Sequence, residues 1–212
     1  LNAAWKRFDR EDDRVAVLGA TGEQAFCVGA DLKDLPRDVW LAMPNLSTTC
    51  DKPIICAVNG FAIGAGATMI MLADMAVAEE QAQFIYPEAK LGAFAGMMAG
   101  FPPRMQVKAG LEWLMTGDPM TAQRAYEIGL VNRVVPKGQA MASALETAAK
   151  IAANAPLVIQ AMKSIARSTL PKSSTELYYP QRAMLDGIAN SADIKEGVAA
   201  FREKRPARFT GR

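Results

Sequence analysis

The sequence of 212 residues contains no histidine. That absence excludes Ser-His-Asp and Cys-His nucleophilic machinery, and it removes the commonest transition-metal ligand. Any chemistry must therefore depend on carboxylates, lysines or backbone dipoles, and we expect no metal site.

Cysteine is scarce too, with residues only at positions 27, 50 and 56. A small odd number of cysteines argues against a disulfide framework and favours a reducing cytoplasm. Cys56 lies within an apolar run at residues 54–58, so we expect its thiol to pack as a small hydrophobic group.

Long apolar runs and an excess of charge are also missing. No stretch approaches the roughly 18 uninterrupted apolar residues of a membrane span, and the formal net charge is only +2. Neither a membrane nor a nucleic acid is therefore expected as a partner. Half of the residues are hydrophobic, which is ordinary for a globular chain with one substantial core.

The pattern of apolar residues predicts an α/β order. Strands are expected at residues 14–19, 25–28, 53–58, 75–78, 83–86 and 130–135, of which 14–19 and 53–58 are expected to be buried. Helices are expected at residues 64–73, 122–128, 140–153 and 157–168. Thr121 is a candidate N-cap, and Gly129 a candidate helix terminator. A last helix is expected to begin at Asp193, with Glu196 as its capping-box partner. The polar segment 31–49 is predicted to be a loop with some helix.

The first residues of the chain have helical spacing, with Leu1, Ala4, Trp5 and Phe8 on one face. Because no methionine and no capping residue precede them, we expect that the natural N-terminus is missing from this sequence.

Three segments are chemically unusual, and the first is residues 25–31. A short apolar strand there runs into Gly29, where the backbone can turn sharply and expose the next amide. The simpler alternative is a glycine that merely ends a strand.

The second segment, residues 59–68, is a glycine-rich turn between a buried strand and a helix. Its free N–H groups and the positive helix end suit a phosphate or an oxyanion. A dinucleotide site is the competing interpretation, but Met69 occupies the place of its third glycine. The acidic pair Glu79 and Glu80 also comes too soon to be the ribose ligand of such a site.

The third segment, residues 84–92, places Glu88 between a proline and an apolar segment. Partial desolvation there would raise the carboxyl pKa toward a useful acid/base range. A solvated loop carboxylate is the alternative.

Taken together, the ordered motifs at residues 25–31, 52–66, 84–92, 114–117, 122–131 and 200–205 resemble the enoyl-CoA hydratase/isomerase (crotonase) family. The resemblance extends from about Arg14 onward. It implies an α/β, crotonase-like spiral of strand-strand-helix turns with a helical C-terminal region. Residues 1–136 would form the core and residues 137–212 a trimerisation region, giving a homotrimer or a dimer of trimers.

The resemblance also implies roles for particular residues. The amides of Ala30 and Ala65 would bind the thioester oxygen of an acyl-CoA as it becomes an enolate, and Glu88 would move the proton. No cofactor is expected, because coenzyme A is part of the substrate. Implied substrate contacts are Ala30, Asp31, Leu32, Lys33, Ala65, Thr68, Phe201 and Lys204. For Lys33 and Lys204, solvated surface lysines remain the alternative.

The sequence departs from the family pattern at several places. Thr68 stands where two-glutamate hydratases have their first glutamate, and residues 93–98 form an altered, apolar stretch. The segment between Asp31 and Lys52 is short, so residues are expected to be absent around Pro36 and Arg37.

The expected activity is isomerisation or hydration of an enoyl-CoA with Glu88 as the single acid/base, and the loss of the first glutamate favours isomerisation. Other reactions through a CoA enolate, such as thioester hydrolysis, decarboxylation or dehalogenation, stay open because a fold does not fix a function. A second class is a non-catalytic protein that binds acyl-CoA or a nucleotide.

Overall fold

The apolar run at residues 54–58 forms strand β3 (Ile54–Val58), and every residue of this strand is buried. In the computed structural model, which describes residues 1–31, 33–34, 38–92, 104–172 and 174–212, β3 pairs in parallel with β1 (Ala16–Leu18) and β5 (Met75–Glu79). Strand β8 (Arg133–Val135) completes a parallel sheet of order β1-β3-β5-β8. A strand buried on both faces requires cover on both sides of its sheet.

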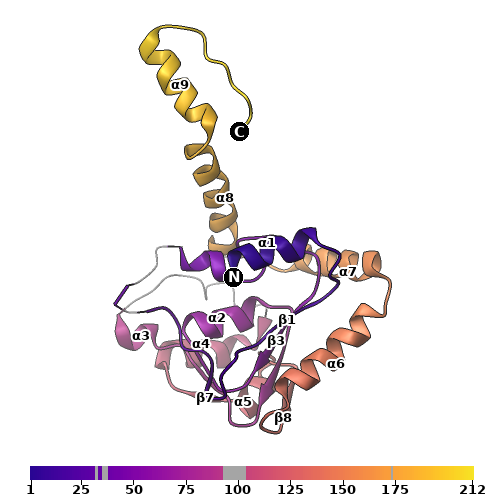
Figure 1. Ribbon diagram of the computed structural model, residues 1–212. Coiled ribbons are helices and arrows are strands. Elements are labelled where there is room, and N and C mark those ends of the chain that lie inside the picture. The colour runs from indigo at the N-terminus through magenta and orange to yellow at the C-terminus, as the bar shows by residue number, and fades with distance from the viewer. Residues whose placement is uncertain (32, 35–37, 93–103, 173) are drawn as a thin grey trace.

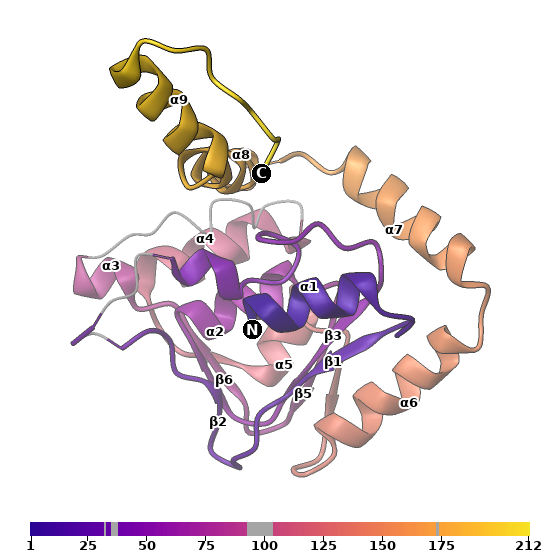
Figure 2. The same cartoon turned by 45° about the horizontal axis from the view of Figure 1, so that its top comes forward.

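A second sheet has the order β2-β4-β6-β7 within the described residues. Its strands are β2 (Ala25–Cys27), β4 (Phe61–Ile63), β6 (Gln83–Ile85) and β7 (Met120–Thr121). The pairing is parallel except between β6 and β7. Along the chain, β1, β3 and β5 are each followed by a strand of the second sheet and then by helical residues, as in β3, β4 and α2, whereas β8 leads directly into a helix. The chain therefore advances as a spiral (Figures 1 and 2).

Helices fill the spaces between and around these strands. They are α1 (Asn2–Arg10), the 3-10 helix η1 (Val39–Ala42), α2 (Ala65–Leu72), α3 (Glu88–Leu91), α4 (Val107–Thr116), α5 (Ala122–Glu127), α6 (Ala140–Ala152), α7 (Pro156–Thr169), α8 (Ser174–Ala189) and α9 (Ala192–Glu203).

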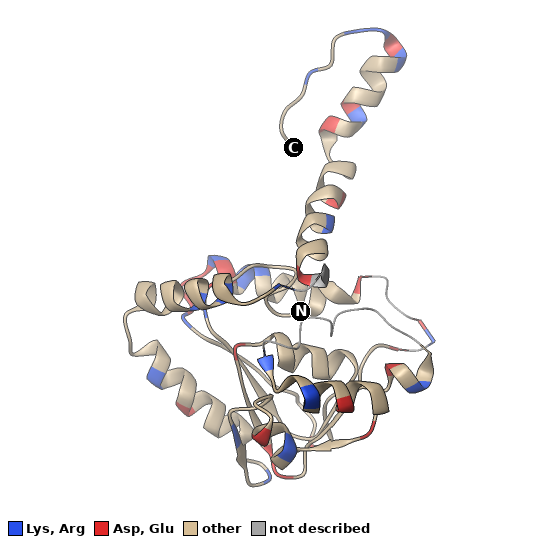
Figure 3. Ribbon diagram, turned by 180° about the vertical axis from the view of Figure 1, so that it is seen from behind, with Lys and Arg blue, Asp and Glu red and all other residues tan. Residues whose placement is uncertain are grey.

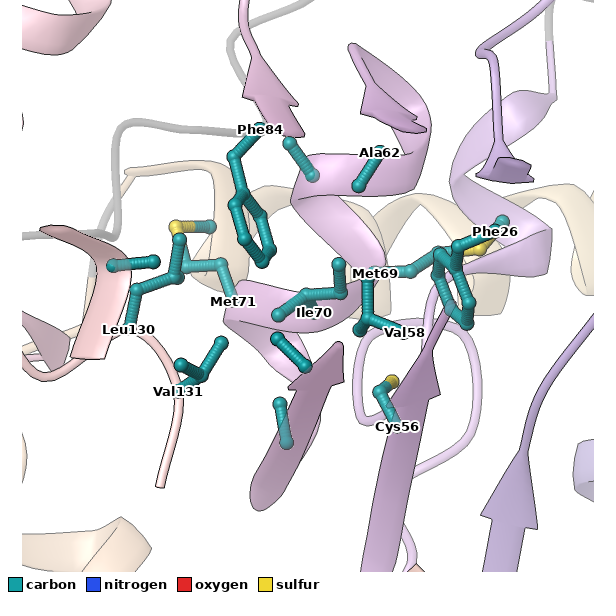
Figure 4. Close-up of a cluster of buried hydrophobic side chains, with 14 of the residues drawn as sticks. Phe26, Cys56, Val58, Ala62, Met69, Ile70, Met71, Phe84, Leu130 and Val131 are labelled. Carbon is teal, nitrogen blue, oxygen red and sulfur yellow. The ribbon is translucent and has the colours of Figure 1, made fainter. Parts of the chain in front are cut away.

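The main core lies around α2, whose residues from Gly66 onward are all buried. Figure 4 shows Met69, Ile70 and Met71 of this helix among side chains from both sheets. Successive residues of a strand face opposite sides of its sheet, so the side chains of β3 pack into two separate layers. Cys56 and Val58 face α2, whereas Ile55 and Ala57 pack against α6. Both faces of the parallel sheet are thus covered.

The C-terminal helices are joined to the core by a few polar and aromatic contacts. On α7, Lys163 Nζ donates to Asp74 Oδ2 at 2.7 Å and to the Lys52 carbonyl at 2.8 Å. At the start of α8, Glu176 forms an ion pair with Arg104. Near it, the Tyr179 ring stacks on Trp40 with 5.1 Å between centroids. Beyond these contacts α8 and α9 project away from the core as an arm (Figure 1).

Most of the expected elements are confirmed, with boundaries shifted by a few residues. Thr121 caps α5, since its Oγ1 accepts a hydrogen bond from Arg124 N at 3.2 Å, and Gly129 follows the helix with φ of 84°. Cys56 is fully buried, and all three cysteines are free thiols. On α1, Trp5 and Phe8 are buried as expected, whereas Leu1 and Ala4 are exposed.

The predicted capping box of the last helix is wrong. Ser191 is the N-cap of α9, and its Oγ accepts from Ile194 N at 3.1 Å. Asp193 instead accepts from Thr210 N at 2.7 Å, and Glu196 pairs with Arg205 at 2.6 Å. The tail after α9 folds back and binds both carboxylates, so Asp193 and Glu196 interact with the tail rather than with the N-terminus of the helix.

Elements that the sequence did not predict are β4, β7, α3, α4 and α8. Strand β4 has only three residues inside a glycine-rich turn, and α8 contains Pro180, which usually marks a break. Basic and acidic residues are interspersed along the ribbon in Figure 3. In the described part of the chain, no helix combines the length and apolarity needed to cross a membrane.

Candidate active site

The site is built from two turns that lie against each other. At the end of β2, Gly29 has φ of 97°, a conformation that side chains disfavour. A Cβ at this position would lie 3.2 Å from the Ile63 carbonyl oxygen and 3.9 Å from Ala65 N. The turn at Gly29 and Ala30 is therefore pressed against the turn at Gly64 and Ala65, which opens α2.

The start of α2 is held in place by close backbone contacts. Gly64 adopts φ of 53° and ψ of −108°, and its N–H donates to the Ile85 carbonyl of β6 at 2.9 Å. A Cβ on Gly66 would lie 2.3 Å from the Cys27 carbonyl oxygen. Only glycine allows α2 to approach β2 this closely.

Two amides at these turns remain available to a ligand. Ala65 is the first residue of α2, so its N–H has no carbonyl within the helix to bond. Ala30 and Ala65 are both half-buried. Within the part of the chain that the structure describes, neither N–H donates a hydrogen bond to another residue. Such free, fixed donors can bind an anion or a developing oxyanion.

The Glu88 carboxylate lies beside the same turn. Glu88 is the first residue of α3, and its Oε1 lies 3.2 Å from the position that a Cβ on Gly64 would take. Its Oε2 is buried and accepts no hydrogen bond from any described residue. Because the carboxyl loses hydration without gaining a cationic partner among the described residues, burial raises the pKa of Glu88 above its ordinary value.

Aromatic residues support the strand that leads to Glu88. Trp113 Nε1 donates to the Phe84 carbonyl at 3.1 Å, and the Trp113 ring lies 6.3 Å from that of Tyr86. Burial, and secondly the charge of Glu88, raise the pKa of the Tyr86 phenol. Trp113 was not predicted to support the site, because its contact with β6 joins residues far apart in the sequence.

The other predicted substrate contacts among the described residues lie in three separate places. Asp31 and Lys33 follow Ala30 in an exposed turn, where Lys33 N donates to Asp31 Oδ1 at 2.8 Å. Thr68 is 0% exposed. Phe201 and Lys204 lie at the end of α9, in the arm away from this chain's own site (Figure 1).

Some predictions fall on residues outside those described. These are Leu32 as a substrate contact, the apolar stretch 93–98, and the shortening at Pro36 and Arg37. Residues 93–103 contain no acidic residue, so this segment cannot contribute a second carboxylate.

The fold and the site define a class of α/β protein in which two free amides stand beside a desolvated carboxyl. Comparison with known proteins gives this class a family. The model of the family described as enoyl-CoA hydratase/isomerase matches residues 1–212. The chain belongs to this family.

Individual relatives agree with that assignment. The chain is similar to a carnitinyl-CoA dehydratase of Proteus mirabilis, with 36% identity over 236 residues, 100% of this chain and 87% of the relative. It is similar to the mitochondrial enoyl-CoA hydratase of Pongo abelii, with 32% identity, 99% of this chain and 76% of the relative. The alignment with the Proteus protein spans 236 residues, more than the 212 of this chain, so this chain is internally shorter than that relative.

Solved structures show the same relationship. A carnitinyl-CoA dehydratase from Mycobacterium avium superposes with a TM-score of 0.71 at 34% identity, covering 100% of this chain and 87% of that one. An enoyl-CoA hydratase from Mycobacterium marinum gives a TM-score of 0.73 at 33% identity, covering 100% and 86%. The expected crotonase-like fold is thereby confirmed.

Proposed function

We propose that the protein adds water reversibly to an enoyl-CoA thioester, with Glu88 as its single acid/base and the amides of Ala30 and Ala65 as its oxyanion hole. One observation carries the proposal. Two free amides at adjoining turns stand beside a carboxyl whose Oε2 is buried and unpaired among the described residues. The names of the relatives, dehydratase and hydratase, favour this reaction over others of the family.

One carboxylate suffices for the proton transfers of hydration. Glu88 accepts a proton from water as the water oxygen bonds to C3. The electron pair of the C2–C3 double bond then moves toward the thioester oxygen, where the two amides stabilise the enolate. The Glu88 carboxyl returns its proton to C2 as the carbonyl re-forms. Dehydration reverses each step, and coenzyme A serves only as the carrier part of the substrate.

Isomerisation is the second candidate, and Thr68 favours it. Because the family's first glutamate is replaced, the site has fewer groups to orient a water molecule. Glu88 would remove a proton from C2 of a 3-enoyl-CoA and return it to C4. The enolate and the oxyanion hole would be the same.

A two-substrate assay decides between these functions. Crotonyl-CoA tests hydration through the loss of its conjugated enoyl absorbance, and a 3-enoyl-CoA tests isomerisation through the gain of that absorbance. In heavy water, a single carboxylate predicts deuterium at C2 on the face that receives the hydroxyl at C3. Calorimetric binding of both substrates without turnover would support the non-catalytic alternative instead.

We further propose that the protein assembles as a homotrimer or a dimer of trimers in the cytoplasm. Assembly is supported by exposed apolar side chains along α7, α8 and α9, among them Leu157, Ile165, Met184 and Val198. The cytoplasmic location is supported by three free thiols, of which two are buried.

A further inference from the structure

The peptide group between Gly64 and Ala65 is held at one end and free at the other. Its carbonyl oxygen, on Gly64, accepts from Thr68 N at 3.0 Å and from Thr68 Oγ1 at 3.2 Å. Its N–H, on Ala65, donates to no described residue. The same amide therefore carries the proposed oxyanion donor and the acceptor of the Thr68 hydroxyl.

The burial of Thr68 determines what its hydroxyl can do. The residue is 0% exposed, so its side chain lies beneath the amide and presents no surface to a ligand. The single hydroxyl proton is directed to the Gly64 carbonyl. In this arrangement Thr68 can affect bound substrate only through that amide.

A hydrogen bond at a carbonyl changes the N–H of the same peptide group. Electron density drawn toward the oxygen polarises the N–H and makes it a stronger donor, by roughly 10–30% per bond in condensed-phase estimates. Two donors on one oxygen also fix the plane of the peptide, so the N–H needs no reorientation when charge develops. Threonines within helices often bond the carbonyl four residues earlier. Here that carbonyl belongs to the peptide whose N–H faces the site.

We propose that Thr68 is a positioning residue of the oxyanion hole, which orients and polarises the Gly64–Ala65 amide. This inference rests on the proposed function. It gives a role to the residue that replaces the family's first glutamate, and that role requires a hydroxyl rather than a carboxylate.

The first test compares three variants with crotonyl-CoA as substrate. Thr68→Val removes the hydroxyl with little change in shape. We expect kcat to fall about fivefold to tenfold and KM to change less than about twofold, which is a smaller loss of kcat than the ~100-fold cost of deleting a direct donor. Thr68→Ser keeps a hydroxyl, so its kcat should stay within about twofold of the parent protein. Thr147→Val is the matched control, because Thr147 Oγ1 makes the same kind of bond, to Ser143 O at 3.0 Å, on α6. This control should leave kcat unchanged.

The second test reads the hydrogen bond directly and needs no turnover. Butyryl-CoA labelled with carbon-13 at its thioester carbonyl is bound to each variant, and the infrared carbonyl stretch is recorded. We expect the parent protein to lower the stretch and Thr68→Val to lower it less, with Thr68→Ser and Thr147→Val like the parent. An unchanged stretch and kcat in Thr68→Val would overturn the role of Thr68 while leaving the oxyanion hole intact. A stretch that the parent protein does not lower would overturn the oxyanion hole itself, and the role of Thr68 with it.

Discussion

Glu88 combines two features that rarely persist without a function. One carboxylate oxygen is buried without a partner among the described residues, and the other lies against Gly64, whose φ is positive. The desolvated oxygen costs stability that the rest of the fold has to offset, and the turn at Gly64 has a conformation that side chains disfavour. Perturbed carboxyls in such surroundings are typical of acid/base sites.

The first prediction concerns Glu88→Gln. The amide keeps the shape of the side chain but cannot accept and return a proton, so kcat should fall at least ~100-fold while KM stays similar. Steady-state kinetics with crotonyl-CoA measures both constants. Glu80→Gln is the control, because Glu80 is an exposed acid outside the site, and it should behave like the parent protein. Near-normal turnover by Glu88→Gln would show that another group moves the proton.

The second prediction follows from the direction of the pKa shift. Burial raises the pKa of Glu88 in the folded protein above its ordinary value of 4.5. Below pH 4.5 both states are protonated and the carboxyl carries no penalty. As pH rises through the folded pKa, the unfolded chain has already lost its proton, so stability falls. Thermal melts should therefore show Glu88→Gln more stable than the parent at mildly alkaline pH. The two should be equal below pH 4.5. A constant difference at all pH values would mean that the shift is absent.

At the scale of elements, the site depends on how closely α2 approaches β2. Gly66 and Gly187 both lie within helices, so replacing either by alanine gains the same helix propensity of roughly 0.8–1.0 kcal/mol. They differ in their surroundings. A Cβ at Gly66 meets the Cys27 carbonyl oxygen at 2.3 Å, whereas a Cβ at Gly187 meets nothing within 4 Å.

The third prediction uses that difference. Gly66→Ala should lower the free energy of unfolding by about 1–3 kcal/mol, because the clash is with backbone that cannot move cheaply. It should also lower kcat, since the start of α2 carries the Ala65 amide. Gly187→Ala should leave activity unchanged and stability equal or slightly higher. Denaturant unfolding and kinetics measure both effects. A stable, fully active Gly66→Ala protein would contradict the tight contact.

Elements with a strong local signal were the ones that the sequence predicted well. The all-apolar run of β3, the glycine-opened helix α2 and the Thr121 cap each depend on neighbouring residues. Strand β4 and helix α8 were missed, because three residues carry too little periodicity and Pro180 reads as a break. In the site, the glycine turns and Glu88 were visible as motifs. The contact of Gly66 with Cys27 was not, because it joins residues whose proximity only the fold creates.

At the scale of the whole molecule, the C-terminal helices leave apolar side chains in water. The fourth prediction is that light scattering at micromolar concentration finds a trimer or a larger assembly, which covers this surface. Met162→Lys with Ile165→Lys places charges on two exposed positions of α7 and should shift the protein toward smaller species. Lys150→Glu on exposed α6 is the control. A clean monomer across the concentration range would contradict assembly.

The position of α9 has a thermodynamic consequence. Phe201, which is 86% exposed, and Lys204 lie at the end of an arm that leaves the chain's own site. We therefore predict that these two residues contact coenzyme A in the site of a neighbouring copy. Substrate affinity then becomes a function of protein concentration by mass action. We expect KM for acyl-CoA to rise as the protein is diluted through its association range, and saturating acyl-CoA to strengthen association by the same factor. Kinetics at a series of protein dilutions measures the coupling energy between substrate binding and association through KM, and sedimentation with and without acyl-CoA measures the same energy through association. A KM independent of dilution would place the ligands of coenzyme A within a single chain.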